Sequence, residues 1–131
     1  MSHLLGIEIC DNIRVAAKKK YPQYSFNTIL PPVWQVVYDY VFVSGTFNLK
    51  QPECTDAQWQ AWVEETVRLL WRKTEKGLAM NFLTVSPDWK EEGLWYPPSQ
   101  QIVLEWLDPY PSTIEFREEY GLHEWTLLVE K

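Results

Sequence analysis

Short apolar runs alternate with segments of helical periodicity along this chain, and this alternation constrains its fold more than any other feature. The clearest helix is predicted after Thr55, which forms a possible capping box with Gln58. Its apolar face recurs at helical spacing, over Trp59, Trp62, Val63, Thr66, Val67, Leu70 and Trp71. Gly77 is the predicted C-terminal stop of the helix. Residues 78–85 follow almost at once, and their continuous apolar pattern predicts a buried strand.

Two strands with a helix between them are predicted at the start of the chain. Residues 4–9 form a short apolar run, which is typical of a buried parallel strand. Asp11 or Asn12 can cap the helix that follows, and Pro22 ends it. Residues 24–29 are then the predicted second strand.

Residues 38–43 are rich in aromatic and β-branched side chains and lead directly into Ser44 and Gly45. This composition predicts a buried strand. A helix that starts at Pro32 is the alternative, because it would place four apolar side chains on one face, namely those of Trp34, Val37, Tyr38 and Val41.

The last third of the chain predicts one more helix and a hairpin. Ser99 can cap a helix over 100–107, although 101–107 also fits a strand. Residues 113–120 and 122–130 resemble two antiparallel strands joined by a tight turn at Gly121. The order of elements predicts a single α/β domain over residues 1–131, with a doubly wound sheet that ends in an antiparallel pair.

Composition excludes several classes of function. The net charge of −6 argues against a protein that binds the phosphate backbone of nucleic acids. No apolar run approaches the ~20 residues that a membrane span needs. His3 and His123 are the only histidines, so a metal site is not expected. Two cysteines and no secretory signal at the N-terminus predict a cytoplasmic protein with free thiols. The eight tryptophans suit a small core made of large side chains, and alternatively a ligand pocket or an interface.

The order and spacing of these segments resemble the class I S-adenosylmethionine-dependent methyltransferases. The resemblance runs from about Leu4 to the end of the chain, with each motif short and tolerant. It is carried by the Tyr-Asp-Tyr-Val-Phe-Val-Ser-Gly segment at 38–45, by Lys-Gly-Leu-Ala-Met-Asn-Phe at 76–82 and by Tyr-Gly-Leu-His-Glu-Trp-Thr-Leu at 120–127. It implies a Rossmann-like methyltransferase sheet that is truncated at its N-terminus and ends in an antiparallel hairpin. S-adenosylmethionine is the implied cofactor.

The resemblance also implies roles for individual residues. Glu8 would accept hydrogen bonds from the cofactor ribose, and alternatively it is a surface carboxylate that precedes a helix. The other implied cofactor-binding residues are Asn27 and Thr28 near the adenine, which also fit a plain loop, and Ser44, Gly45, Thr46 and Phe47 near the methionine arm. His123, beside Glu124, is the candidate general base, and alternatively a surface histidine of the hairpin.

The chain departs from the family pattern before Leu4, where the family has its first strand and a Gly-x-Gly loop. The five glycines of this sequence all stand singly. Because the family's first strand lies mid-sheet, its two neighbours would keep open backbone edges. Either these two strands pair directly or another chain covers the gap, and we expect a homo-oligomer or a partner protein that covers the open edge. The expected function is methyl transfer to a small molecule, and the alternative is a non-catalytic methyltransferase-like protein that serves as a protein-interaction module.

Overall fold

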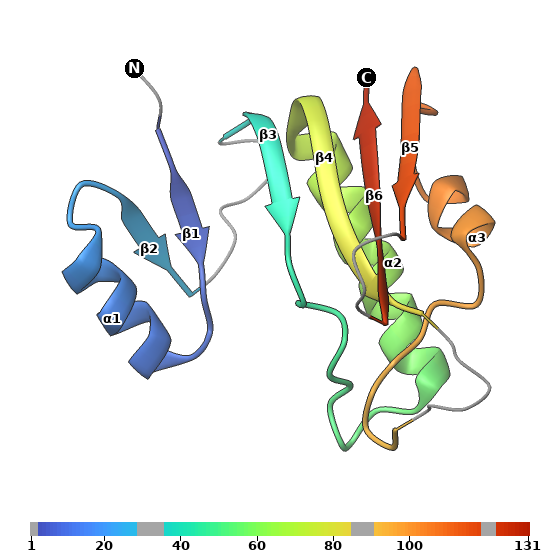
Figure 1. The fold of residues 1–131 in the computed structure, drawn as a ribbon, viewed down its shortest axis with the longest axis horizontal. Coiled ribbons are helices and arrows are strands. Elements are labelled where there is room, and N and C mark those ends of the chain that lie inside the picture. The colour runs from blue at the N-terminus through green and yellow to red at the C-terminus, as the bar shows by residue number, and fades with distance from the viewer. Residues whose placement is uncertain (1–2, 29–35, 85–90, 119–122) are drawn as a thin grey trace. The chain divides into compact units, whose positions relative to one another are not determined.

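The computed structural model describes residues 3–28, 36–84, 91–118 and 123–131 of the chain. The chain divides into two compact units, Met1–Val36 and Val37–Lys131, which we call the first and the second unit. Each unit has its own sheet (Figure 1). The expectation of a single domain over residues 1–131 stays a prediction. The Pro32 start of the alternative helix and the turn at Gly121 lie outside the described residues.

The first unit is a strand–helix–strand unit. β1 (Leu5–Ile7) and β2 (Ser25–Asn27) pair in parallel, which confirms two parallel strands here. α1 (Asp11–Lys20) connects them, and three lysines in its last turn complement the helix dipole.

Two details predicted for the first unit are wrong. β1 is not buried, since Ile7 is 39% exposed and Ile9, just beyond it, is 77% exposed. Two short strands and one helix have too little apolar surface to enclose a side chain. The N-cap of α1 is Cys10, which makes no side-chain capping hydrogen bond, and Asp11 is already helical.

The second unit contains a four-stranded sheet in the order β3-β4-β6-β5. β3 (Tyr38–Val43) pairs in parallel with β4 (Thr74–Leu83), and β6 (Glu124–Glu130) pairs antiparallel with both β4 and β5 (Thr113–Arg117). The strand prediction for 38–43 and the antiparallel hairpin are therefore confirmed, and the helical alternative is excluded for these residues. β3 is buried only in part, because Phe42 points to an exposed face and Val43 to the core.

α2 (Asp56–Lys73) is the amphipathic helix that the spacing of its tryptophans predicts. Its capping box is present as expected, since the Thr55 hydroxyl accepts the N–H of Gln58 and the Gln58 side chain accepts the N–H of Thr55. Gly77 is not the stop of this helix. The helix ends at Lys73, four residues earlier, and Gly77 lies within β4 opposite Tyr40, where a Cβ would stand 3.1 Å from the tyrosine ring.

α3 (Gln100–Glu105) settles the ambiguity at 100–107 in favour of a helix. The Ser99 hydroxyl accepts the N–H of Ile102, so Ser99 is the predicted N-cap. The buried side of this short helix is formed by Val103 and Leu104.

Aromatic side chains form the core of the second unit. The ring of Phe82 stacks on Phe47 at 5.7 Å and on Trp125 at 4.8 Å between centroids. The indole N–H of Trp59 donates to the carbonyl of Phe47 at 3.0 Å. Large aromatic rings remove much surface from water, which is how a small unit obtains a core. The buried tryptophans are Trp59, Trp71, Trp95, Trp106 and Trp125.

The two faces of this sheet differ. Leu78, Met80 and Phe82 are buried at alternate positions of β4, on the face against which α2 packs (Figure 1). The residues between them point to the other face, which we call the open face. The paired rows of the open face are Tyr40, Gly77, Glu130 and Thr113, then Phe42, Ala79, Leu128 and Glu115.

Candidate functional site

Three predicted residues of the first unit lie together at the carboxyl ends of β1 and β2. Ligands bind α/β sheets beyond this end of the strands. The N–H of Glu8 donates to the carbonyl of Asn27 at 2.9 Å, so the two strand ends are joined. Oε1 of Glu8 accepts the N–H of Cys10 at 2.9 Å, and Oε2 makes no hydrogen bond to a described residue. Asn27 and Thr28 are exposed. This edge therefore offers one unengaged carboxylate oxygen beside an amide and a hydroxyl.

In the second unit, residues 44–47 form a turn directly after β3, which we call the β3 turn. Gly45 has φ +67°, a conformation that L-residues with a side chain rarely adopt. Its carbonyl accepts the N–H of Asn48 at 3.4 Å. Ser44 and Thr46 are exposed. The predicted cofactor residues of this unit are thus brought to the carboxyl end of β3.

Sequence reasoning missed the role of Asn81 at this edge and named Glu124 only as the neighbour of His123. Asn81 of β4 accepts the N–H of Gly45 through Oδ1 at 2.6 Å. Its Nδ2 donates to Oε2 of Glu124, at the start of β6, at 3.3 Å. The available signal was a single carboxamide within the apolar run 78–85. A polar side chain in such a run calls for hydrogen-bond partners.

Phe47 and His123 differ in their surroundings. Phe47 is fully buried beneath the β3 turn, with its ring against Phe82. Its side chain thus belongs to the core, and a cofactor could meet only its backbone. His123 is exposed, and its carbonyl accepts the N–H of Thr84 at 2.9 Å, so it lies at the same edge as Glu124.

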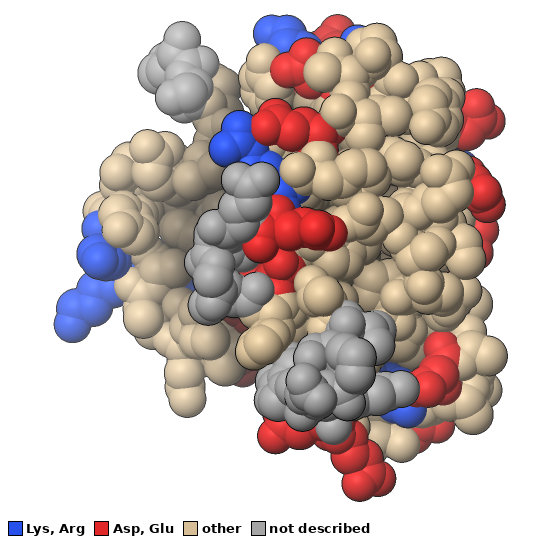
Figure 2. Space-filling view, turned by 45° about the vertical axis from the view of Figure 1, so that its right-hand side comes forward, with Lys and Arg blue, Asp and Glu red and all other residues tan. Residues whose placement is uncertain are grey.

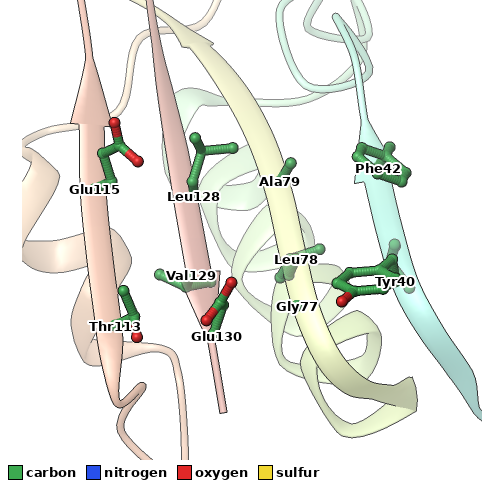
Figure 3. Close-up of a pocket in the computed structure, with 11 residues that line it drawn as sticks. Tyr40, Phe42, Gly77, Leu78, Ala79, Thr113, Glu115, Leu128, Val129 and Glu130 are labelled. Atoms are coloured by element: carbon green, nitrogen blue, oxygen red, sulfur yellow. The ribbon is translucent and has the colours of Figure 1, made fainter.

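A shallow groove with a volume of ≈ 280 Å³ runs across the open face of the second-unit sheet (Figure 3). One end is aromatic, with Tyr40 and Phe42 of β3 exposed by 55% and 77%. The other end is acidic and hydroxylic, with Thr113 and Glu115 on β5 and Glu130 on β6. The sequence pattern did not reveal this groove, because an apolar run indicates burial without showing what covers each face.

On the face drawn in Figure 2, charged side chains are scattered. In the view of Figure 2, Asp and Glu occur at many separate places and Lys and Arg form small groups. A hydrogen bond and the charge of Asp39, whose Oδ1 lies 2.8 Å from Nζ of Lys76, raise the pKa of that lysine.

Within residues 3–28, 36–84, 91–118 and 123–131, no group of three His, Cys, Asp or Glu side chains is placed to hold a metal ion. The helices of this described part include none with the length and apolarity of a membrane span.

Comparisons with known proteins show what the chain is similar to. No protein-family model matches the chain. The chain is 30% identical over 95 residues to "Putative methyltransferase Rv1506c" of Mycobacterium tuberculosis, and the match covers 71% of this chain and 57% of that protein. The structure of this chain is similar to that of magnesium protoporphyrin IX methyltransferase of Synechocystis PCC 6803 with bound SAH, with a TM-score of 0.65. The two are 10% identical, and the match covers 99% of this chain and 64% of that one.

A protein of Bordetella parapertussis described as a possible exported protein is also similar, with a TM-score of 0.64 and 15% identity over 98% of this chain and 53% of that one. The chain thus spans between about half and two thirds of the length of these relatives. The two structural matches extend over almost all of this chain and confirm the fold expected from the sequence.

Proposed function

We propose that this chain, which has the fold of the class I S-adenosylmethionine-dependent methyltransferases, binds that cofactor and serves methyl transfer to a small molecule. The observation that carries the proposal is the β3 turn. It lies at the ligand-binding end of the sheet, with Gly45 held by Asn81 and with the Glu124 carboxylate beside it. The Synechocystis enzyme of the same fold was crystallised with both SAM and SAH.

In each unit taken by itself, the groups at the carboxyl end of the sheet suit a part of such a cofactor. Oε2 of Glu8 is unengaged among the described residues and can accept a ribose hydroxyl, while Oε1 already holds the N–H of Cys10. Ser44 and Thr46 offer hydroxyls on the exposed side of the β3 turn. When bound, S-adenosylmethionine supplies an electrophilic methyl group. The protein then contributes by orienting the acceptor toward it, and His123 is the exposed base that can take up a proton from the acceptor.

Isothermal titration calorimetry with S-adenosylmethionine and S-adenosylhomocysteine tests the proposal. We expect micromolar binding by the full chain and binding about 10- to 100-fold weaker in Glu8→Ala, since hydrogen bonds to a charged group are worth about 1.5–3 kcal/mol. Glu105→Ala, which removes an exposed carboxylate of α3, is the matched control and keeps the affinity. Absence of binding by the well-folded chain contradicts the proposal.

A second candidate function, a protein-interaction module, is favoured by the unpaired edges and the open face. Among the described strands, β1 pairs only with β2 and β3 only with β4, so each keeps one open edge. Exposed aromatic rings beside an open edge mark an interaction surface. We propose a second copy of this chain as the occupant.

The two ends of the open-face groove favour a second copy because they are complementary to each other. A two-fold axis parallel to the strands, in the plane between two stacked sheets, places the aromatic end of each groove over the acidic end of the other. Tyr40 then faces the end of its row that holds Glu130 and Thr113, and Phe42 faces the end of its row that holds Leu128 and Glu115. An interface of this type is isologous.

Light scattering coupled to size-exclusion chromatography tests the interaction. We expect a dimer at micromolar concentration, and a monomer for Phe42→Asp because a charge then lies in the apolar row. Leu49→Asp, at an exposed leucine outside this face, is the control that stays dimeric. A monomeric wild-type chain overturns the interaction proposal and leaves the cofactor proposal untouched.

The free thiols of Cys10 and Cys54 support a cytoplasmic location, which we propose for the protein.

A further inference from the structure

We propose that Asn81 is a positioning residue, which holds the β3 turn and the Glu124 carboxylate in one fixed arrangement at the carboxyl edge of the second-unit sheet. The inference rests on the proposed function for the use of this edge. The hydrogen bonds that carry it are properties of the second unit alone.

Asn81 connects three strands through its carboxamide. Oδ1 accepts the N–H of Gly45 at 2.6 Å, at the end of β3, and Nδ2 donates to Oε2 of Glu124 at 3.3 Å, at the start of β6. The carboxamide is suited to this place because it carries an acceptor and two donors on one rigid group. An aspartate of the same size can accept from Gly45 and then repels Glu124. A leucine satisfies neither partner.

The bond to Gly45 fixes the conformation of the β3 turn. Gly45 needs its positive φ of +67°, and a Cβ there would meet nothing closer than Asn48 at 4.0 Å. The glycine is therefore required for backbone conformation and not for space. With its N–H held by Asn81, the turn directs Ser44 and Thr46 outward in one arrangement. A preorganised turn binds a ligand more tightly because less conformational freedom is lost on binding.

The bond to Glu124 orients the acceptor side of the same edge. Glu124 is half-buried and follows the exposed His123. Asn81 keeps this carboxylate beside the β3 turn, where it can accept a hydrogen bond from an N–H or O–H group of the methyl acceptor. Loss of Asn81 frees both groups at once.

The Asn81→Asp variant distinguishes a positioning role of Asn81 from a role in packing alone. In Asn81→Asp, two carboxylates lie where the amide and Glu124 were in contact, and such a pair has one strongly raised pKa. At low pH the protonated acid donates to its neighbour as the amide does, so the arrangement is restored. At high pH the two charges repel each other. A residue that only fills space gives no such pH dependence.

Amide NMR spectra and hydrogen exchange of the full chain provide the test, with the Gly45 N–H as reporter. We expect Gly45 to exchange about fivefold faster or more in Asn81→Ala, as loss of a hydrogen bond of ordinary net strength predicts. In Asn81→Asp we expect the Gly45 resonance to shift between pH 4 and pH 7. The wild type and Gln101→Glu, a matched amide-to-acid change on the exposed side of α3, should show no such shift.

Equal Gly45 exchange in the wild type and in Asn81→Ala overturns the inference, and so does a Gly45 resonance independent of pH in Asn81→Asp. If Asn81→Ala fails to fold, the isosteric Asn81→Asp carries the test alone. Titration with S-adenosylmethionine then addresses function, and we expect about tenfold weaker binding by Asn81→Ala. A wild type that binds no cofactor refutes the proposed function, while the Gly45 readout still decides the role of Asn81.

Discussion

The two units of this chain bury their apolar side chains to different extents, although each contains a parallel strand pair. In the second unit, residues of β3, β4, β6, α2 and α3 are buried, and the core contains a stacked set of aromatic rings. In the first unit, α1 has no buried residue, and Leu4, Ile9, Ile13 and Val15 are each more than half exposed. The same element types thus give a core in one unit and an open surface in the other.

The comparison shows that a local sequence pattern specifies a strand or a helix without ensuring its burial. Burial depends on how many elements share the apolar surface, and two strands with one helix are too few. Both units share one feature that allows their packing to be compared directly. Gly6 pairs with Phe26, and Gly77 with Tyr40, so each parallel pair sets a glycine against an aromatic ring.

The largest expected effect tests the core of the second unit. Phe82→Ala removes the central ring of the stack, and truncation of a buried phenylalanine costs about 3–5 kcal/mol. Phe42→Ala, the same change at an exposed ring of the same sheet, should stay within about 0.5 kcal/mol. Urea unfolding followed by tryptophan fluorescence measures both, at concentrations low enough to avoid self-association. Equal costs for the two variants would show that the stack is not the core.

The two glycines provide the next comparison. A Cβ on Gly77 would lie 3.1 Å from the ring of Tyr40 and 3.2 Å from the carbonyl oxygen of Val129, and the carbonyl belongs to a fixed strand. We expect Gly77→Ala to cost about 1–2 kcal/mol through overpacking. In a Tyr40→Ala background the cost should fall but not vanish, since the carbonyl remains. Urea unfolding of the two single variants and the double variant measures this coupling.

Gly6→Ala is the matching change in the first unit. A Cβ there would come within 2.5 Å of the Phe26 ring, a closer approach than at Gly77. The Phe26 side chain is only partly buried and can swing away, so we expect a smaller cost than for Gly77→Ala. Hydrogen exchange across residues 5–7 and 25–27 reports it. A larger cost for Gly6→Ala would show that the first unit is packed more rigidly than its exposed side chains indicate.

The N-caps of α2 and α1 give a third comparison, in which the expected change in stability is about 1 kcal/mol. Thr55→Ala removes the capping box of α2, and such a loss costs about 1 kcal/mol. α1 has no side-chain cap at Cys10, so Cys10→Ser should slow hydrogen exchange in its first turn. Thr55→Ala should destabilise α2 and Cys10→Ser should stabilise α1. The pair therefore tests whether the missing side-chain cap limits the stability of α1. If Cys10→Ser leaves the exchange unchanged, the helix is limited by missing tertiary contacts instead.

These differences explain how far the sequence alone could predict the structure. The capping box at Thr55, the Ser99 cap and the strand at 38–43 were predictable because the signals are local. The end of α2 was not, because Gly77 is a typical helix stop and here serves strand packing against Tyr40. Helix and strand meet directly at Lys73 and Thr74, where no turn residue marks the boundary.

The sequence predicts where residues 44–47 lie in the sheet, but not the hydrogen bonds that join the candidate site. In α/β sheets ligands bind beyond the carboxyl ends of the strands, so the prediction could place residues 44–47 at that edge of the sheet. The bonds of Asn81 to Gly45 and Glu124 join residues 36 and 43 positions apart, and no local spacing encodes them. The burial of Phe47 is likewise a tertiary property, because its ring packs on Phe82 from a distant strand.

The smallest expected effect concerns Lys73, the fully buried last residue of α2. Burial lowers the pKa of Lys73, whose ammonium lies 5.9 Å from the centroid of the Tyr38 ring. Between this lowered pKa and 10.5, the ordinary lysine value, unfolding takes up a proton, so the free energy of unfolding should rise with pH. Burial raises the pKa of Tyr38, which acts in the opposite direction above pH 10.0 but is shared by wild type and variant. We therefore expect the free energy of unfolding of the wild type to rise relative to that of Lys73→Met as the pH rises to 10.5. Parallel urea titrations of the two proteins measure this difference. A difference that is constant with pH would mean that folded Lys73 keeps its ordinary pKa, and that its burial is relieved by hydration or by ion pairing.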